Sequence, residues 1–170
     1  MKKLILNLGL IGILGCSNPI SPTLSPEKQY ENIKNNEWRT EETIEIAQEK
    51  MERERLKTLE DVRELQSNFK TCYEERNWQS DILTLFYYDL WGDCEDASVL
   101  GIWALGNIGI PAKEMYLYDK ESNSYHSICV IYDNKIMISN NLLLELNGKD
   151  LLKEIKLLNF YSGYDKIEEK

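Results

Sequence analysis

Apolar residues recur at spacings of three and four along a charged stretch that ends near residue 65. They are Ile44, Ala47, Met51, Leu56, Leu59, Val62 and Leu65. On a helix, such residues share one face and leave the charged residues between them in water. The pattern therefore predicts one or two amphipathic helices.

The stretch from residue 97 to 108 is apolar on nearly every side, which predicts a central buried helix. Gly101 and Gly106 lie inside it. Because glycine in a helix interior costs about 1 kcal/mol relative to alanine, both glycines indicate close approach of neighbouring backbone. Gly109, followed by Pro111, predicts where the helix ends.

Three strand-like runs follow the helix, at residues 113–118, 125–132 and 135–139. Polar residues at 119–124 and the pair Asp133-Asn134 separate them and are typical of turns. The order predicts an antiparallel meander.

Taken together, these elements predict an α+β fold with a helical N-terminal part and a central helix packed on the meander. Apolar residues at 142–146 and an amphipathic stretch at 151–158 are expected to close the domain. Residues 166–170 are expected to fray.

The chain begins with a different pattern, in which Lys2 and Lys3 precede an apolar run from Leu4 to Leu14 and then Gly15-Cys16. This resembles a bacterial lipoprotein signal, in which the cysteine is lipidated and becomes the new N-terminus. An uncleaved anchor or a plain secretory signal is the alternative. We expect an exported protein, anchored to a bacterial membrane through Cys16 and facing the periplasm or exterior.

Composition limits the organisation and the partners. A chain of 170 residues supports one core, and a net charge of −9 argues against binding nucleic acid or anionic membranes electrostatically. We expect a monomer. The expected parts are a signal peptide (1–15), a Pro/Ser-rich tether (16–26), a charged helical segment (27–55), the folded domain (56–160) and a tail (161–170).

Cys94 is the candidate nucleophile because it stands where the central helix is expected to begin. Free N–H groups and the macrodipole at a helix start stabilise a thiolate. Asp93 is a plausible cap, but Glu95 and Asp96 oppose the thiolate, so Cys94 needs a basic partner. Trp91 flanks it and is the best candidate for a substrate groove, although such aromatic residues are more often core.

His126 is the only histidine in the chain and opens the second predicted strand. A lone histidine is more often structural than catalytic. A cysteine at a helix start and a histidine on a following strand, however, form an arrangement in which imidazole can deprotonate the thiol.

Three segments in this order resemble the transglutaminase-like cysteine protease superfamily: residues 92–96 (GDCED), 105–112 (LGNIGIPA) and 126–130 (HSICV). The resemblance covers about residues 56 to 145. It implies a papain-like fold and acyl chemistry at amide carbonyls, with Cys94 as the nucleophile and His126 as the base.

The third member of the site departs from the family pattern, because the usual aspartate is replaced in the segment Ile138-Ser139-Asn140. We expect Asn140 to orient the imidazole, with Ser139 as the alternative. A two-residue turn at Asp133-Asn134 would place Ser139 on the face of His126, and a three-residue loop would place Asn140 there. A neutral third member predicts reduced activity or none.

The remaining cysteines, Cys72 and Cys129, are either bonded to each other or buried as free thiols. A metal site made by acidic residues near Cys94 lacks the spacing of a calcium loop, so we expect no metal and no cofactor.

These observations predict an enzyme, an exported and lipid-anchored cysteine hydrolase that acts on a peptide or isopeptide amide of a peptide or protein substrate. A catalytically degenerate lipoprotein that serves as a binding or scaffold module is one alternative. A protein transglutaminase, in which an amine resolves the acyl-enzyme, is the other.

Overall fold

A computed structural model describes residues 38–71, 79–131, 133, 135–146, 150–158, 161 and 163–170 of the chain. The predicted signal peptide, Cys16, the tether and Cys72 lie outside the described residues. No helix within the described part is long and apolar enough to cross a bilayer.

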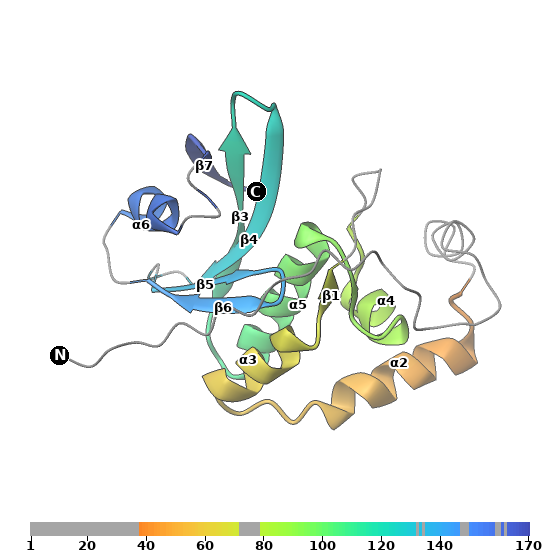
Figure 1. Ribbon diagram of the computed structural model, residues 1–170. Helices are drawn as coiled ribbons and strands as arrows, with labels where there is room; N and C mark the ends of the chain where they lie inside the picture. Colours follow the sequence, from red (N-terminus) through yellow and green to blue (C-terminus); the bar gives the residue numbers. More distant parts are fainter. Residues whose placement is uncertain are drawn as a thin grey trace.

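Helices and strands both occur along the chain, and the strands form two sheets (Figure 1). The predicted α+β class is therefore confirmed. In order, the elements are α2 (Glu41–Arg53), α3 (Leu59–Ser67), β1 (Lys70–Thr71), α4 (Ile82–Tyr87), β2 (Trp91–Gly92), α5 (Cys94–Asn107), β3 (Ala112–Asp119), β4 (Ser124–Ile131), β5 (Ile136–Ser139), β6 (Leu142–Glu145), α6 (Leu151–Leu157) and β7 (Lys166–Glu169).

The two amphipathic helices expected before residue 66 are α2 and α3. A threonine precedes each helix, and its side chain accepts a hydrogen bond from the backbone N–H of the third helical residue. The side chain of that third residue accepts a hydrogen bond from the backbone N–H of the threonine in return. These capping boxes satisfy N–H groups that have no partner inside the helix. The predicted face is buried, since Ala47, Val62 and Leu65 lie in the main core.

The five-stranded sheet has the order β6-β5-β4-β3-β7, and its strands β3, β4 and β5 form the predicted antiparallel meander. Strand β7 is a correction. Residues 166–169 do not fray, because they pair with β3 in the register Leu117↔Ile167 and close that edge of the sheet. Residues 166–169 are therefore part of the sheet.

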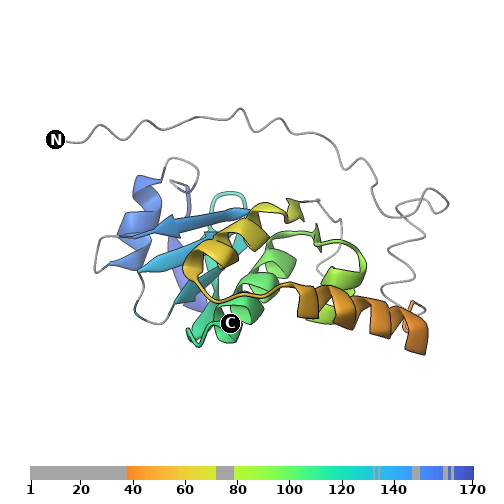
Figure 2. The same ribbon diagram turned by 90° about the horizontal axis from the view of Figure 1, so that it is seen from below.

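Helices cover both faces of this sheet, with α5 on one side and α6 on the other (Figures 1 and 2). Side chains alternate between the faces, as a strand requires. Cys129 and Ile138 point into the core shared with α5. Ile128 and Met137 point into a second core with Leu151 and Ile155 of α6.

Of the two glycines inside α5, one is explained by packing. A Cβ atom on Gly101 would meet the Cβ and Sγ of Cys129 and the Cδ1 of Ile138 at 3.2 to 3.3 Å, so this glycine lets the helix approach the sheet. The expectation for Gly106 is wrong, because among the described residues no neighbouring backbone or side chain from outside its own helix turn lies within 4 Å of such an atom. Gly109 has φ of +77° just after the helix, as its predicted role in ending α5 requires.

Candidate active site

The segment just before Cys94 is held by a strand that is distant in sequence. Strand β2 pairs in parallel with β1, in the register Lys70↔Trp91 and Thr71↔Gly92. Trp91 is therefore fixed beside β1 and is partly buried. Its role in a substrate groove stays a prediction.

The acidic residues around Cys94 build the start of α5. The Asp93 carboxylate accepts hydrogen bonds from the backbone N–H groups of Glu95 and Asp96 at 2.9 and 3.4 Å. Asp96 accepts from the N–H of Asp93 in return, at 3.2 Å, and from the N–H of Ser80 at 2.6 Å. Asp96 thus caps the helix and ties it to the segment before α4.

Gly92 is required by the same arrangement. A Cβ atom at Gly92 would lie 2.3 Å from Oδ2 of Asp96, the oxygen that accepts from Asp93. The GDCED segment is therefore a structural unit in which glycine leaves room for the capping carboxylate.

Cys94 reaches the central strand through its sulfur. Its Sγ accepts a hydrogen bond from the backbone N–H of Ser127 in β4 at 3.4 Å. That N–H belongs to the peptide that joins Ser127 to His126. The fold therefore brings the predicted nucleophile to the backbone beside the predicted base, from residues 32 positions apart.

The imidazole of His126 is held by a hydroxyl group instead of a carboxylate. Its Nε2 lies 2.7 Å from Oγ of Ser139. The register of β4 and β5, with Cys129 opposite Ile138, is the one expected for a two-residue turn, and its continuation puts Ser139 on the face of His126.

The side chain that contacts the imidazole is therefore that of Ser139, the alternative, and not that of Asn140, while a role in orienting the ring for catalysis stays a prediction. Asn140 follows the last residue of β5, with φ of +48°, and its carbonyl oxygen accepts a hydrogen bond from the side chain of Gln66. The turn that begins there carries Asn140 off the face of the strand that holds His126.

Two tyrosines that sequence reasoning missed complete the surroundings of the ring. Tyr161 stacks on His126 with ring centroids 5.6 Å apart, and its hydroxyl donates a hydrogen bond to Oγ of Ser139 at 2.5 Å. Tyr164 lies 6.3 Å from the same ring. The three aromatic residues at positions 160, 161 and 164, just before β7, were the only sequence signal for them.

Burial makes the resting thiol a weak acid. The pKa of Cys94 is raised to about 11, mainly by loss of water on burial and in part by the nearby carboxylates of Asp93 and Glu95, while the N–H of Ser127 acts in the opposite direction. The helix start was expected to favour the thiolate. Here burial and the acidic neighbours outweigh it.

Burial acts on the histidine in the opposite direction. Desolvation disfavours the imidazolium and lowers the pKa of His126 to about 4. At neutral pH both partners are therefore uncharged, as a thiol and an imidazole. A negative third member, which would stabilise imidazolium, is replaced by the neutral Ser139.

A further carboxylate lies beside Ser127, the residue whose N–H contacts Cys94. Glu114 of β3 accepts a hydrogen bond from the hydroxyl of Ser127 at 2.8 Å and pairs with Lys170 at 3.0 Å. These acids do not form a metal cluster, since no group of three or more metal-binding side chains is found among the described residues. Their contacts are hydrogen bonds and ion pairs within the fold.

Cys129 differs from Cys94 in its surroundings. It is fully buried and carries a free thiol, and it packs against Gly101 as a small apolar side chain. Of the two alternatives for this cysteine, the structure shows the buried free thiol. Its supposed partner, Cys72, lies outside the described residues.

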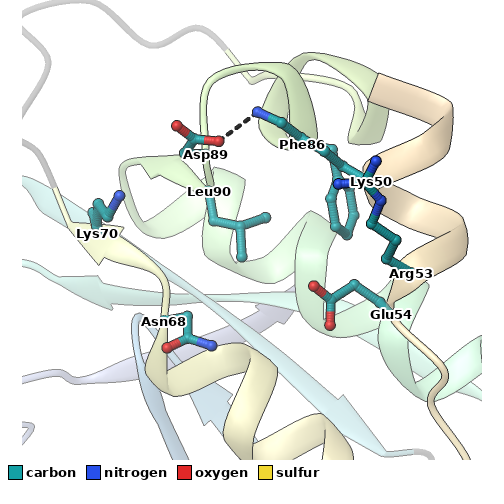
Figure 3. Close-up of a pocket in the computed structure, with 8 residues that line it drawn as sticks. All are labelled: Lys50, Arg53, Glu54, Asn68, Lys70, Phe86, Asp89 and Leu90. Atoms are coloured by element: carbon teal, nitrogen blue, oxygen red, sulfur yellow. Dashed lines mark hydrogen bonds and ion pairs between the residues drawn. The ribbon is translucent and has the colours of Figure 1, made fainter. Parts of the chain in front are cut away.

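A pocket of about 400 Å³ lies elsewhere, where α2 and α4 meet the turn before β2 (Figure 3). In it, Lys50 reaches across to the carboxylate of Asp89, above Phe86. Neither Cys94 nor His126 lines this pocket.

Comparisons with known proteins concern the fold. No protein-family model matches the chain, and no curated protein matches it. Calcium-bound LapG of Legionella pneumophila is 13% identical with a TM-score of 0.46, over 72% of this chain and 77% of LapG. The EGTA-treated form is 15% identical with a TM-score of 0.46, over 74% and 76%.

A candidate cysteine protease of Cytophaga hutchinsonii is 14% identical with a TM-score of 0.39, over 89% of this chain and 56% of that protein. These likenesses are too low to decide a function.

Proposed function

We propose that this protein is a cysteine hydrolase that cleaves peptide or isopeptide amides through an acyl-enzyme on Cys94. The observation that carries the proposal is the hydrogen bond between Ser127 N–H and Cys94 Sγ, which sets the sulfur at the peptide next to His126. The three sequence segments that resemble transglutaminase-like cysteine proteases support the same residues.

In the proposed reaction, the thiol of Cys94 attacks the amide carbonyl while His126 takes its proton. Because Nε2 faces Ser139, the proton goes to Nδ1. The same proton then passes to the leaving amine as the C–N bond breaks. Water, deprotonated by His126, hydrolyses the thioester and returns the free thiol.

The neutral resting pair fits general-base catalysis better than a preformed ion pair. With the pKa of the thiol near 11 and that of the imidazole near 4, the proton leaves sulfur only as the new bond forms. The proposed donor to the oxyanion is the backbone N–H of Cys94. The N–H groups of Glu95 and Asp96 already donate to the carboxylate of Asp93, so they are not free to bind the oxyanion.

Paired variants test the proposal. Cys94→Ala and His126→Ala should each abolish cleavage of peptide and isopeptide substrates, followed by mass spectrometry, while thermal unfolding stays cooperative. Cys129→Ala is the matched control, since it removes a thiol that packs away from the site, and it should retain turnover. Cleavage that survives in Cys94→Ala would refute the proposal.

The alternative is a degenerate member that binds or scaffolds. The neutral Ser139 and the high pKa of the thiol favour it. Trapping of an acyl-enzyme separates the two functions: the absence of an acyl group on Cys94 with every peptide and isopeptide substrate would leave only the binding role. Transglutamination would show itself as amine incorporation into the product.

We also propose that the protein is exported and attached to a bacterial membrane by lipid on Cys16, on the strength of the signal-like sequence alone. Labelling of cells with a radioactive or clickable fatty acid should mark the protein, and Cys16→Ser should abolish the label. Labelling that persists in Cys16→Ser would exclude this site of attachment.

A further inference from the structure

Two tyrosines between α6 and β7 place their rings against the imidazole of His126. Tyr161 stacks on it, with ring centroids 5.6 Å apart and ring planes 30° apart, and Tyr164 lies 6.3 Å away at an angle of 38°. The two tyrosine rings are themselves 6.1 Å apart. The three rings therefore form one cluster, in which each ring lies within contact range of the other two.

Backbone hydrogen bonds anchor both tyrosines. The N–H of Tyr161 donates to the carbonyl of Leu158, where α6 ends, at 2.8 Å, and the N–H of Tyr164 donates to the carbonyl of Tyr161 at 3.2 Å. The N–H of Asp165 then donates to the carbonyl of Tyr118 in β3 at 2.8 Å, just before β7 begins. Both rings also pack against the second core, beside α6. The two rings are thus held in place by the elements on either side of them.

The groups found around the imidazole in the described part of the chain are uncharged at neutral pH. The residue opposite His126 in β3 is Leu117, which is fully buried, and the contact from β5 is the hydroxyl of Ser139. On the α5 side, Cys94 is a protonated thiol, because its pKa is about 11. Burial raises the pKa of both tyrosine hydroxyls, so they stay protonated as well.

Neutral rings remove water from the imidazole without supplying a charge in its place. Loss of water disfavours the imidazolium, and burial lowers the pKa of His126 to about 4. The face of a tyrosine ring can also attract a cation, which would favour the imidazolium. Because the pKa of His126 is lowered and not raised, the loss of water outweighs this attraction.

We propose that Tyr161 and Tyr164 are positioning residues that act through His126, because their rings form a cover that keeps water from the imidazole and leaves it uncharged in mildly acidic surroundings. This inference rests on the proposed function for its consequence, since a base that takes the proton of Cys94 must itself be unprotonated. An imidazole in water, with its ordinary pKa of 6.5, would be mostly protonated and inactive as a base at pH 5.

The titration of His126 tests the cover directly, because it is the only histidine in the chain. The full chain, made without a histidine tag and labelled with ¹⁵N-histidine, gives one pair of ring nitrogen signals to follow against pH. The wild type should titrate near pH 4. Tyr161→Ala and Tyr164→Ala each admit water to the imidazole, so each should raise the pKa of His126 by about 1, and the double variant should raise it further.

Two controls separate the rings from other effects. Tyr161→Phe keeps the stacked ring and removes only the hydroxyl that donates to Ser139, so it should leave the pKa of His126 near 4. Tyr125→Ala removes a tyrosine from the opposite face of β4, where its ring packs on Tyr116 at 5.2 Å, and it should also leave that pKa unchanged. If Tyr161→Phe raised the pKa as much as Tyr161→Ala, the hydroxyl would be responsible and the inference would fail.

Catalysis gives a second readout, because the acidic limb of kcat/KM against pH reports the protonation of the free base. This limb should move to higher pH in Tyr164→Ala, together with the histidine titration, so that activity at pH 5 falls relative to activity at pH 8. Tyr164 is the less buried of the two tyrosines, so this variant keeps the test available if Tyr161→Ala does not fold.

The possible results distinguish this inference from the proposed function. A wild-type pKa of His126 near 6.5, or a pKa that stays near 4 in the folded alanine variants, would overturn the inference even if Cys94 is catalytic. A pKa that rises in the alanine variants of a protein without turnover would support the cover and count against the proposed function.

Discussion

Replacing Ser139 by aspartate should convert the site from a neutral pair into one that charges more easily. The carboxylate would stand near the 2.7 Å contact to Nε2 and would accept from both Nε2 and the Tyr161 hydroxyl. An opposite charge at this distance raises a histidine pKa by about 1 to 3. From about 4, the pKa of His126 should therefore rise to roughly 5 to 7.

The effect on the thiol follows from the difference between the two pKa values. The pKa of Cys94, near 11, exceeds the pKa of His126, near 4, by about 7. If the attraction between the two charges is left out, only about one site in ten million therefore holds a thiolate beside an imidazolium. Each increase of one in the histidine pKa makes the ion pair tenfold more frequent. Because a thiol with a pKa near 11 is already ionised in about one site in ten thousand at pH 7, alkylation of Cys94 at neutral pH should accelerate by about twofold at most, and the titration of the histidine is the sensitive measurement.

The measurements are a ¹⁵N titration of the single histidine and the pH dependence of alkylation, with Asn140→Asp as the matched control. Asn140 is the next residue along the chain but does not contact His126, so its variant should change neither quantity appreciably. The reasoning would fail if folded Ser139→Asp left the pKa of His126 near 4. It would also fail if Asn140→Asp raised that pKa instead, because the register would then be wrong.

Three further predictions concern stability. Gly92→Ala should lower the free energy of unfolding by about 1 to 3 kcal/mol, measured by urea denaturation, because its Cβ displaces the capping carboxylate of Asp96. Gly106→Ala should stabilise the protein by about 1 kcal/mol, because alanine favours a helix and has room there. At Gly101 the new methyl group would crowd Cys129 and Ile138, and this overpacking should cancel the gain. Equal changes in the free energy of unfolding for the two variants would contradict the close contact of Gly101 with the sheet. Because folding lowers the pKa of His126 from 6.5 to about 4, its contribution to stability is present above pH 6.5 and declines by about 3 kcal/mol as pH falls to 4. His126→Gln should abolish this decline. Buried Asp96, whose pKa is raised to about 7, makes the wild type and His126→Gln alike more stable as pH falls, so the comparison of the two proteins isolates the histidine.

The sequence predicted the elements whose signals are local. Periodic apolar residues located α2, α3 and α5, and alternation with turn residues located β3, β4 and β5. Strand β7 was missed because residues 166–169 contain a single apolar residue, Ile167, and read as a charged terminus. Its pairing with β3 depends on backbone hydrogen bonds, which leave no pattern in side chains.

The residues of the candidate site also divide into those with a local sequence signal and those that depend on the fold. Cys94 and His126 could be found because each stands in a recognisable segment. The choice between Ser139 and Asn140 depended on one residue of loop length, which composition does not determine. Tyr161 could not be assigned at all, since its contact with Ser139 spans 22 positions and arises only when the chain after α6 returns to the sheet.

The carboxylates that surround Cys94 have a consequence for its chemical durability. Peroxides and other oxidants attack the thiolate, and the protonated thiol reacts far more slowly. By opposing the thiolate, Asp93 and Glu95 add to the effect of burial and keep the sulfur in its less vulnerable form. For the exported enzyme proposed above, this arrangement would preserve the nucleophile between encounters with substrate, at the expense of a slower attack when one arrives.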